Sequence, residues 1–556
     1  MGSIGPSWQD VAAKRRNDIN RKIPQSWLLS TETVKNHRPV DLPRQSGLLS
    51  PDELYLTELS AVTLLAAICD RKYSSVQVTR AFCKRAAIAH QVTNCLAEVL
   101  FDEALAQAEE LDNYMDTHGK PMGMLHGLPV SVKEHIFVKG TTATAGLIAW
   151  ADQLSPDDAL IVRTFRDQGA VFHVKTTNPQ TLMACETDSN LFGRTLNPHN
   201  PKLSSGGSTG GEGALIAMHG SPLGIGTDIG GSIRTPSAFC GIYGLKPSVA
   251  RLPHSGLAGL HDGMMNVVGA VGPMATALDD LDLFCAAALA QRPWDHEPSL
   301  IELPWKKDVQ RPAKLKIGVV WNDGVVHPHP PITRALQETV SSLRSAGHTV
   351  VDWDSNLHEG LINAVNQAYF LDGGEEYHEI LEAGNEPEVP LLNWILETHA
   401  TRKYTIQESW KLNSQSDLLR TLYARQLNAT GVDALICPTA PSVASVHNET
   451  RYWGYTSVFN ALDLPAIIIP VSTVKSTDTW DNHPNTLPIG ISTTNDTYRA
   501  LYPETEGPAR YSNAPVGIQI VGRRLQEEKL LMMARTIEQA IRPPHQRTAV
   551  AKNGLT

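Results

Sequence analysis

The feature that most restricts how this chain can fold is a dense cluster of glycine and serine in residues 204–247. Two runs stand out there, SGGSTGGEG at 205–213 and GTDIGGSIR at 226–234. So many glycines disfavour the interior of a strong helix or sheet, because glycine loses the most conformational freedom when it is ordered. We expect instead a tightly bent backbone whose successive N–H groups converge into an anion-binding nest.

Such a nest has two main chemical uses. One is phosphate binding, but neither run contains G-x-x-x-x-G-K-[ST], and Gly224, Gly226 and Gly230 miss G-x-G-x-x-G by one residue. The other is an oxyanion hole, in which N–H donors meet negative charge that develops on a carbonyl oxygen. A serine inside the turn, Ser232, favours the oxyanion hole. Glycine content alone leaves equal room for a structural role, with Ser208 and Ser232 as helix caps.

A serine nucleophile needs a base. The residues around Ser232 do not form a G-x-S-x-G elbow, because the last position is Arg234, which disfavours a Ser/His/Asp hydrolase. A neutral lysine could serve instead. Its pKa would have to fall by about 3 units, or about 4 kcal/mol, to act near neutral pH. Spacing alone does not select which lysine.

Strand and helix patterns alternate along the rest of the chain. Strands are expected at 95–100, 128–132, 170–175, 222–226, 315–321, 348–351, 434–437, 466–471 and 515–521. Helices are expected at 8–22, 59–70, 75–91, 102–117, 213–219, 331–346 and 526–541, with a further helix starting at Ser50. This alternation predicts an α/β fold, a mixed and twisted central sheet covered by helices on both faces.

The organisation predicted from these patterns has one large domain with extensions. Residues 1–50 are expected to form a helical arm, and residues 51–545 the main domain. Within that domain, 355–430 are mainly helical and polar, which suggests a lid. Residues 546–556 are expected to be a tail.

Composition excludes several classes of protein. The net charge of −10 over 556 residues disfavours a nucleic-acid-binding surface. Seven scattered cysteines without a C-x-x-C indicate a reducing compartment, and no run approaches the ~20 apolar residues of a membrane span. We therefore expect a cytoplasmic protein without membrane or nucleic-acid partners.

Two weaker signals point away from metal or thiol chemistry. His327 and His329 have H-x-H spacing, but the surrounding prolines favour a rigid turn over a metal site. Cys240 and Cys437 lie in apolar surroundings and are expected to be packed thiols. No metal or other cofactor is expected.

Three segments resemble the motifs of the amidase-signature family, in the same order and spacing. They are HGLPVSVKEHIFVKG at 126–140, GGSTGGEGALIA at 206–217 and GTDIGGSIRTPSAFCGIYGLKP at 226–247. Further segments, AFCKRAAIAHQVTNC, VKTTNPQTLMACET, PHPPI and APVGIQIVGRRL, resemble the fungal acetamidase branch. The resemblance covers about residues 8–540 and implies the α/β fold of that family.

The resemblance also implies roles for individual residues. Ser232 would be the nucleophile, Lys133 the base, and Ser208, after a cis Gly207–Ser208 bond, would carry the proton between them. The N–H groups expected to form the oxyanion hole are those of Ile229, Gly230, Gly231 and Ser232. Asp228 and Arg234 would hold this loop from behind. The residues expected to line the substrate pocket are Met183, Thr227 and His135.

Two positions depart from the commonest pattern of the family. Glu134 and His135 follow the lysine where many relatives carry Asp and another polar residue, and Thr209 replaces a common second serine. A charged His135 near Lys133 would lower the pKa of the lysine. A neutral His135 would only line the pocket.

The predicted activity is hydrolysis of a carboxylic amide to an acid and an amine or ammonia, with small aliphatic amides favoured by the acetamidase-like motifs. Three alternatives remain open: acyl transfer by the same residues, the glutaminase subunit of a tRNA amidotransferase, and a non-catalytic anion-binding module. The expected partner is a small-molecule amide, and a homodimer is the oligomer considered.

Overall fold

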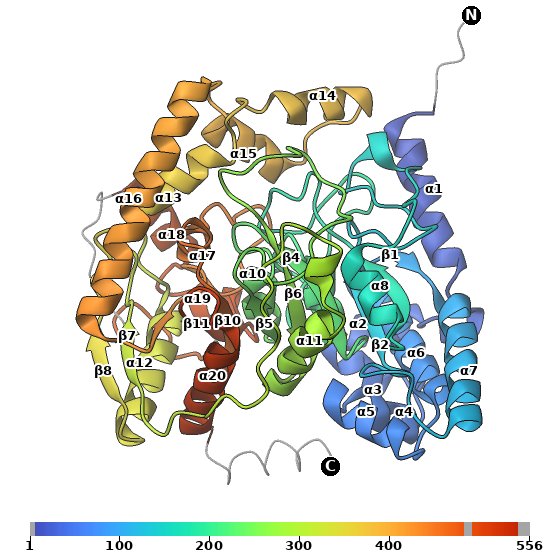
Figure 1. Ribbon diagram of the computed structural model, residues 1–556. Coiled ribbons are helices and arrows are strands. Elements are labelled where there is room, and N and C mark those ends of the chain that lie inside the picture. The colour runs from blue at the N-terminus through green and yellow to red at the C-terminus, as the bar shows by residue number, and fades with distance from the viewer. Residues whose placement is uncertain (1–5, 483–491, 543–556) are drawn as a thin grey trace, which may run out of the picture.

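In the part of the chain that the structure describes, eleven strands form one mixed sheet. The computed structural model describes residues 6–482 and 492–542 (Figure 1). The sheet order is β1-β3-β2-β4-β6-β5-β10-β11-β9-β7-β8, and it runs from the right of Figure 1 to the left. The strands are β1 (Leu96–Val99), β2 (Pro129–Lys133), β3 (Val171–Thr176), β4 (Leu223–Asp228), β5 (Tyr243–Lys246), β6 (Ala270–Ala275), β7 (Lys316–Val319), β8 (Thr349–Asp352), β9 (Ala434–Cys437), β10 (Ala466–Thr473) and β11 (Pro515–Val521).

Helices surround this sheet. They are α1 (Trp8–Arg21), α2 (Thr31–Asn36), α3 (Leu42–Gln45), α4 (Pro51–Thr57), α5 (Ala61–Cys69), α6 (Ser75–Thr93), α7 (Phe101–His118), α8 (Leu160–Arg166), α9 (Gly210–Ala217), α10 (Arg234–Cys240), α11 (Leu278–Ala290), α12 (Pro330–Ser345), α13 (His358–Ala368), α14 (Glu375–Ala383), α15 (Pro390–His399), α16 (Ile406–Thr430), α17 (Gly454–Ala461), α18 (Thr493–Leu501), α19 (Gly507–Arg510) and α20 (Glu527–Ile541).

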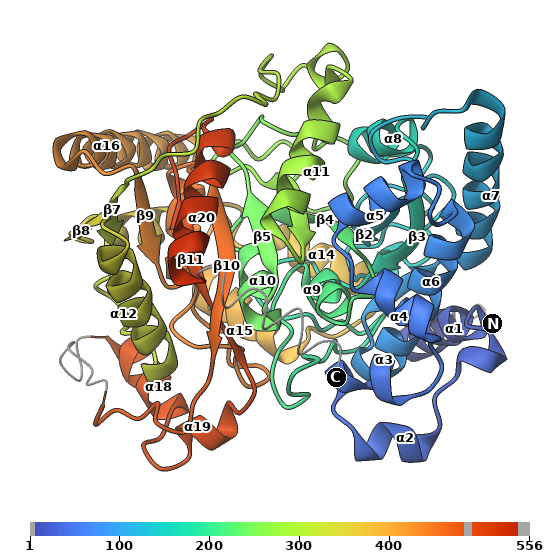
Figure 2. The same ribbon diagram turned by 90° about the horizontal axis from the view of Figure 1, so that it is seen from below.

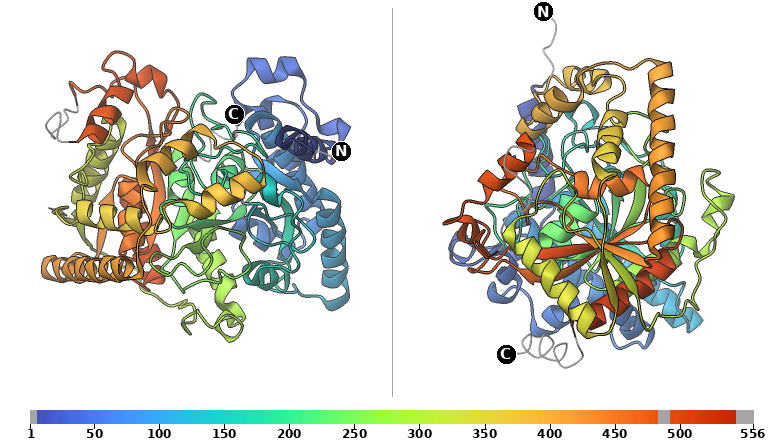
Figure 3. Two further views of the ribbon diagram at one scale, coloured as in Figure 1. Left: turned by 90° about the horizontal axis from the view of Figure 1, so that it is seen from above. Right: turned by 90° about the vertical axis from the view of Figure 1, so that its left-hand side faces the viewer.

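Strand β10 shows how both faces of the sheet are buried. Successive side chains of a strand point to opposite faces. Ile467 and Ile469 pack in the cluster that contains residues of α11 and α20, whereas Ile468 packs with α10. Helices α11 and α20 lie together on one side of the sheet (Figure 2), and the edge-on view shows helices on both sides (Figure 3, right). The predicted α/β fold is confirmed.

The glycine-rich runs are more regular than expected. Gly213 lies in α9, and Gly224 and Gly226 lie in β4, as the helix expected at 213–219 and the strand expected at 222–226 imply. Gly210 and Gly211 also lie in α9, so the prediction that the glycine runs avoid helix and sheet interiors is wrong. The reason is close packing. A Cβ on Gly211 would lie 2.4 Å from the backbone nitrogen of Thr177, and one on Gly224 would lie 2.2 Å from Glu212 Oε2. These glycines let helix α9 lie directly against the sheet.

The predicted extensions fall on different parts of the structure. Helix α1 contacts β1, with Lys22 Nζ 2.8 Å from Glu98 Oε1. Residues 355–430 contain α13–α16, which lie together at the top and upper left of Figure 1. The division at residues 50 and 545 and the lid role stay predictions, and the expected tail 546–556 lies outside the described residues.

No helix in residues 6–482 and 492–542 has both the length and the apolar character needed to cross a membrane.

Candidate active site

Lys133 is the last residue of β2 and its side chain is completely buried. Its Nζ donates hydrogen bonds to Ser208 Oγ at 2.6 Å and to Thr227 Oγ1 at 2.9 Å. Strand β4, which carries Thr227, pairs directly with β2. Both partners are neutral hydroxyls, and among the residues that the structure describes no carboxylate pairs directly with the Lys133 side chain.

Burial removes the charged form of this lysine from water and lowers its pKa to about 7. The carboxylates of Asp228, Glu134 and Glu212 raise the pKa, but they offset only part of the effect of burial. Near neutral pH a large fraction of Lys133 is therefore the free amine, which can accept a proton.

Glu212, which the sequence did not single out, explains part of this balance. It is buried in α9 and accepts hydrogen bonds from Ser131 Oγ at 2.5 Å and from Thr176 Oγ1 at 3.0 Å. Burial raises the pKa of Glu212 to about 8, against the effects of these hydrogen bonds and of Lys133. Its carboxyl group is thus mostly protonated near neutrality and contributes little negative charge. The sequence signal that could have pointed to Glu212 is its position as a glutamate within a run of glycines.

Ser208 and Ser232 approach the same cavity from two different segments. The Gly207–Ser208 peptide bond is cis, and the backbone N–H of Thr209 donates to the carbonyl of Ser232 at 3.1 Å. Both serines border one cavity. In the described part of the chain, no hydrogen bond joins the two hydroxyls; Ser208 Oγ pairs with Lys133.

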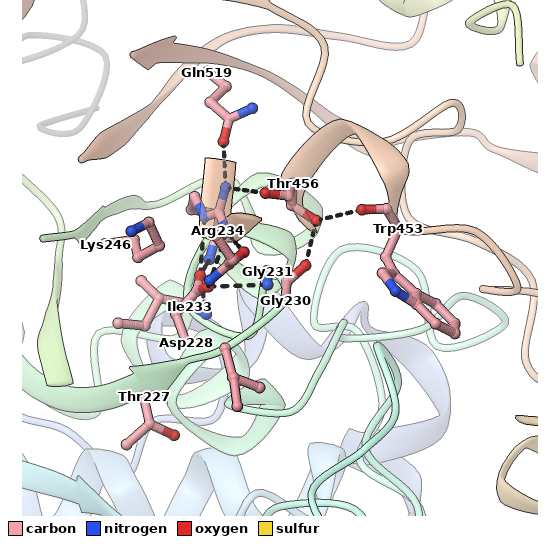
Figure 4. Close-up of polar contacts among 12 residues, drawn as sticks. Thr227, Asp228, Gly230, Gly231, Ile233, Arg234, Lys246, Trp453, Thr456 and Gln519 are labelled. Carbon is pink, nitrogen blue, oxygen red and sulfur yellow. Dashed lines mark hydrogen bonds and ion pairs between the residues drawn. The ribbon is translucent and has the colours of Figure 1, made fainter. Parts of the chain in front are cut away.

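The loop before Ser232 is fastened by a buried ion pair (Figure 4). Arg234 NH2 lies 2.8 Å from Asp228 Oδ1, and both side chains are fully buried. Arg234 also donates to the carbonyl of Thr456 and to Gln519 Oε1, each at 2.8 Å. Burial alone would raise the pKa of Asp228, but the charge and hydrogen bonds of Arg234 outweigh it and hold this pKa well below its usual range. Both Asp228 and Arg234 thus lie behind the loop, and their role in catalysis stays a prediction.

Asp228 also takes one of the four N–H groups predicted for the oxyanion hole. Gly231 N–H donates to Asp228 Oδ1 at 2.9 Å, so the inclusion of Gly231 needs correction: its N–H is already satisfied by the carboxylate. Within the described residues, no acceptor is present for the N–H groups of Ile229, Gly230 and Ser232. Of the four N–H groups predicted for the oxyanion hole, three therefore remain available to bind an oxyanion.

Two hydroxyl groups fix the peptides of this loop. Tyr369 OH donates to the carbonyl of Ile229 at 2.7 Å, and Thr456 Oγ1 donates to the carbonyl of Gly230 at 2.6 Å. In a planar trans peptide the N–H points away from the C=O, so anchoring the Ile229 carbonyl also orients the Gly230 N–H. Both hydroxyls come from segments more than a hundred residues away in the sequence, which is why sequence motifs did not reveal them.

Two cavities border Ser232. The larger has a volume of about 600 Å³ and is bordered by Ser208, Thr227 and His135. The smaller has a volume of about 20 Å³. Met183, predicted to line the pocket, borders both.

His135 lines the larger cavity as a neutral ring. Burial, together with the charge of Lys133, lowers its pKa well below the usual range. Its Nδ1 lies 2.7 Å from the carbonyl of Ala258 and must donate there, so Nε2 accepts from Thr227 Oγ1 at 3.1 Å. The neutral alternative is the one that this geometry favours.

The remaining sequence signals do not meet at this site. His329 Nε2 lies 2.7 Å from the carbonyl of Tyr498, and no cluster in the described part of the chain brings together three His, Cys, Asp or Glu residues able to hold a metal. All seven cysteines are free, and burial raises the pKa of the Cys240 and Cys437 thiols far above their usual range.

Comparison with known proteins gives a consistent result. A family model described as amidase matches residues 77–531. The chain is 40% identical to an acetamidase of Aspergillus oryzae (95% of this chain, 98% of that protein) and 38% identical to an acetamidase of Emericella nidulans (96% and 98%). Among solved structures it resembles a fatty acid amide hydrolase with a TM-score of 0.92 and 34% identity, over 96% of this chain and 95% of the other.

Proposed function

The chain belongs to the amidase family and is an amide-hydrolysing enzyme; we propose that it works through an acyl intermediate on Ser232, with small aliphatic amides as its preferred substrates. The observation that carries the mechanism is the buried Lys133, which has hydroxyl partners only and lies 2.6 Å from Ser208 at a cavity that Ser232 also borders. A base, a proton relay and a nucleophile are thus available at one place.

Acylation begins when Ser232 Oγ attacks the amide carbon. Its proton passes to Ser208 Oγ, whose own proton moves to the free amine of Lys133. The tetrahedral intermediate then collapses, the C–N bond breaks, and the amine leaves with a proton from Ser208, which Lys133 replaces. In the free enzyme Ser208 is hydrogen-bonded to Lys133 and not to Ser232. The hydrogen bond between the two serines would therefore form when substrate binds, as is common for catalytic hydrogen bonds.

The developing oxyanion would be bound by the N–H groups of Ile229, Gly230 and Ser232. These donors are pre-oriented by Tyr369, Thr456 and the Asp228–Arg234 pair, so they would need little rearrangement when charge develops. Water then attacks the acyl-serine, with its proton taken along the same relay. Free acid leaves and the enzyme is regenerated.

The preference for small aliphatic amides is supported by the two acetamidases that resemble this chain. The fatty acid amide hydrolase suggests long acyl groups as a second candidate, at lower identity. Initial rates on acetamide, butyramide and oleamide, with Ser232→Ala as the blank, separate the two. Faster turnover of oleamide than of acetamide contradicts the small-amide proposal.

The alternatives to hydrolysis have their own tests. Product analysis in the presence of hydroxylamine distinguishes acyl transfer, because exclusive release of free acid excludes it. Activity of the single purified chain without other subunits excludes a glutaminase subunit. Labelling by a fluorophosphonate probe that depends on Ser232 excludes a passive anion-binding module.

We also propose a cytoplasmic location and a homodimer. Seven free cysteines, six of them buried, fit a reducing compartment. Cell fractionation tests the location, and light scattering on the purified protein tests the dimer.

A further inference from the structure

We infer that the two cavities divide the substrate unequally: the small cavity receives a short acyl group, and the large one receives a bulky apolar amine. The proposed preference for small groups would then apply to the acyl side alone, and the substrates would include secondary amides in which a short carboxylic acid is joined to an alkyl or arylalkyl amine. This inference rests on the proposed function, because it takes Ser232 as the nucleophile and Ser208 as the proton donor to the leaving amine.

The cavities meet at the nucleophile. Five residues border both of them: Leu182, Met183, Ile229, Ser232 and Tyr369. A carbonyl carbon bonded to Ser232 would therefore lie at the junction, with one substituent free to enter each cavity.

Ser208 decides which substituent goes where. It borders the larger cavity together with Thr227 and His135, and it does not border the smaller one. The leaving nitrogen must come within hydrogen-bond reach of Ser208 to be protonated. The amine is therefore directed into the larger cavity, and the acyl group into the smaller.

The smaller cavity has room for very little. Its volume of about 20 Å³ is only slightly more than the ~10–15 Å³ that one water-sized probe occupies. Trp453 and Cys185 form part of its wall, and Trp453 is held in place by a hydrogen bond from its Nε1 to Asn366 Oδ1 at 3.0 Å. This small volume favours a methyl group over a longer chain.

The larger cavity accommodates a substantial group. At about 600 Å³ it lies within the ~300–1,000 Å³ range of pockets that bind drug-sized ligands. Apolar side chains supply much of its wall: Phe137, Leu257, Leu260, Met264 and Val267. The loop that carries most of them is tied to the segment after β2 by Phe137 N–H to the carbonyl of Gly256 at 2.9 Å and by Ala258 N–H to the carbonyl of His135 at 2.8 Å. This wall favours alkyl and aryl groups on nitrogen.

Two matched substrate series test the division. The first varies the acyl group of primary amides: acetamide, propionamide, butyramide and hexanamide. The second keeps the acetyl group and varies the amine: N-methyl-, N-butyl- and N-benzylacetamide. Benzylamine and ammonia have nearly equal basicity, so acetamide and N-benzylacetamide differ mainly in size.

We expect kcat/KM to fall by about tenfold or more for each CH2 beyond acetamide, because each added group strains a filled pocket. In the amine series we expect N-benzylacetamide to be hydrolysed at least as well as acetamide. Hydrolysis of hexanamide at least as fast as acetamide, with little turnover of N-benzylacetamide, would overturn the inference while leaving the acyl-serine mechanism intact. Absence of turnover in both series, without fluorophosphonate labelling, overturns both.

Two variants test the walls separately. Trp453→Leu enlarges the small cavity and should raise the ratio of kcat/KM for butyramide to that for acetamide by about tenfold. Leu260→Trp, at a half-buried position, narrows the large cavity and should lower the ratio for N-benzylacetamide to acetamide by a similar factor. Circular dichroism confirms folding, and Leu260→Trp keeps the test decisive if Trp453→Leu does not fold. If Trp453→Leu changes the amine series instead, or Leu260→Trp changes the acyl series, the assignment of the two cavities is contradicted.

Discussion

Lys133 and Arg234 are two equally buried cations that meet very different partners. Lys133 donates to two neutral hydroxyls, Ser208 and Thr227. Arg234 pairs with the carboxylate of Asp228 and also donates to Thr456 and Gln519. The two sites are connected, because Asp228 is also the largest of the charges that raise the pKa of Lys133.

The difference shows that the partners of a buried cation decide what it can do. Burial lowers the pKa of Lys133 to about 7, and its two hydroxyl partners bring no opposing charge, which makes it a usable base. Arg234, with the carboxylate of Asp228 and several other acceptors as partners, fixes the backbone of the loop before Ser232. Lys133 is suited to accept a proton, and Arg234 is suited to hold the backbone in place.

The largest expected effect comes from removing the base. Lys133→Ala should lower kcat/KM by about 10³-fold or more, since general-base catalysis commonly contributes ~10²–10⁴-fold. The folded state should tolerate the change, because a buried lysine with a lowered pKa disfavours folding wherever the unfolded chain would be protonated. Steady-state kinetics with thermal unfolding checks both.

Lys175 provides the matched control for this variant. It is a second fully buried lysine, on neighbouring strand β3, and burial lowers its pKa to about 8. Its Nζ donates to Thr141 Oγ1 and to the carbonyl of Thr142, and it borders neither cavity. Lys175→Met should therefore keep kcat/KM within a small factor of the wild type. An equal loss in both variants would contradict a special role for Lys133.

Breaking the ion pair should mainly affect stability. Arg234→Met leaves the carboxylate of Asp228 buried without its partner, which typically costs ~3–5 kcal/mol. Urea denaturation measures the change in the free energy of unfolding. The double variant Arg234→Met with Asp228→Asn should recover part of this stability. If the single variant is as stable as the wild type, the pair does not anchor the loop.

The pH dependence follows from the lowered pKa of Lys133. The base works as the free amine, so kcat/KM should fall about tenfold per pH unit below an apparent pKa near 7 and level off above it. A pH–rate profile on acetamide measures this limb. A flat profile from pH 5 to pH 9 would rule out titration of the base in this range.

Glu212→Gln is expected to have the smallest effect. Glu212 raises the pKa of Lys133, so its removal should move the acid limb toward lower pH. The shift should be modest because the carboxyl group, with a pKa of about 8, is mostly protonated near neutrality. The amide can still accept a hydrogen bond from Thr176 or Ser131. A shift toward higher pH would contradict the assigned electrostatics.

The sequence predicted the strand and helix alternation well because hydrophobic periodicity is local. Ser50 provides another local signal: the helix expected to start there is α4, and the Ser50 side chain caps it in a box with Glu53. The start of α9 was not predicted because glycine at Gly211 is required by the close approach of helix and sheet, here to the backbone of Thr177. A close contact between segments distant in the sequence leaves no local pattern in the sequence.

The candidate site shows the same limit. Lys133, Ser208 and Ser232 could be selected only by resemblance to a family, because a lysine at a strand end is not distinctive. Tyr369, directly after α13, and Thr456, in α17, hold the loop before Ser232. Both are remote from this loop in the sequence, so no local pattern could reveal them. The Gly231 N–H was misassigned because only the folded loop brings Asp228 within 2.9 Å.

The most direct test of the acyl-serine mechanism is mass spectrometric localisation of a fluorophosphonate label on the intact enzyme. The account predicts a single label on the peptide that contains Ser232, its absence in Ser232→Ala, and much slower labelling of Lys133→Ala than of Lys175→Met. A label on Ser208 or on another residue, or full labelling of Ser232→Ala, would contradict the account.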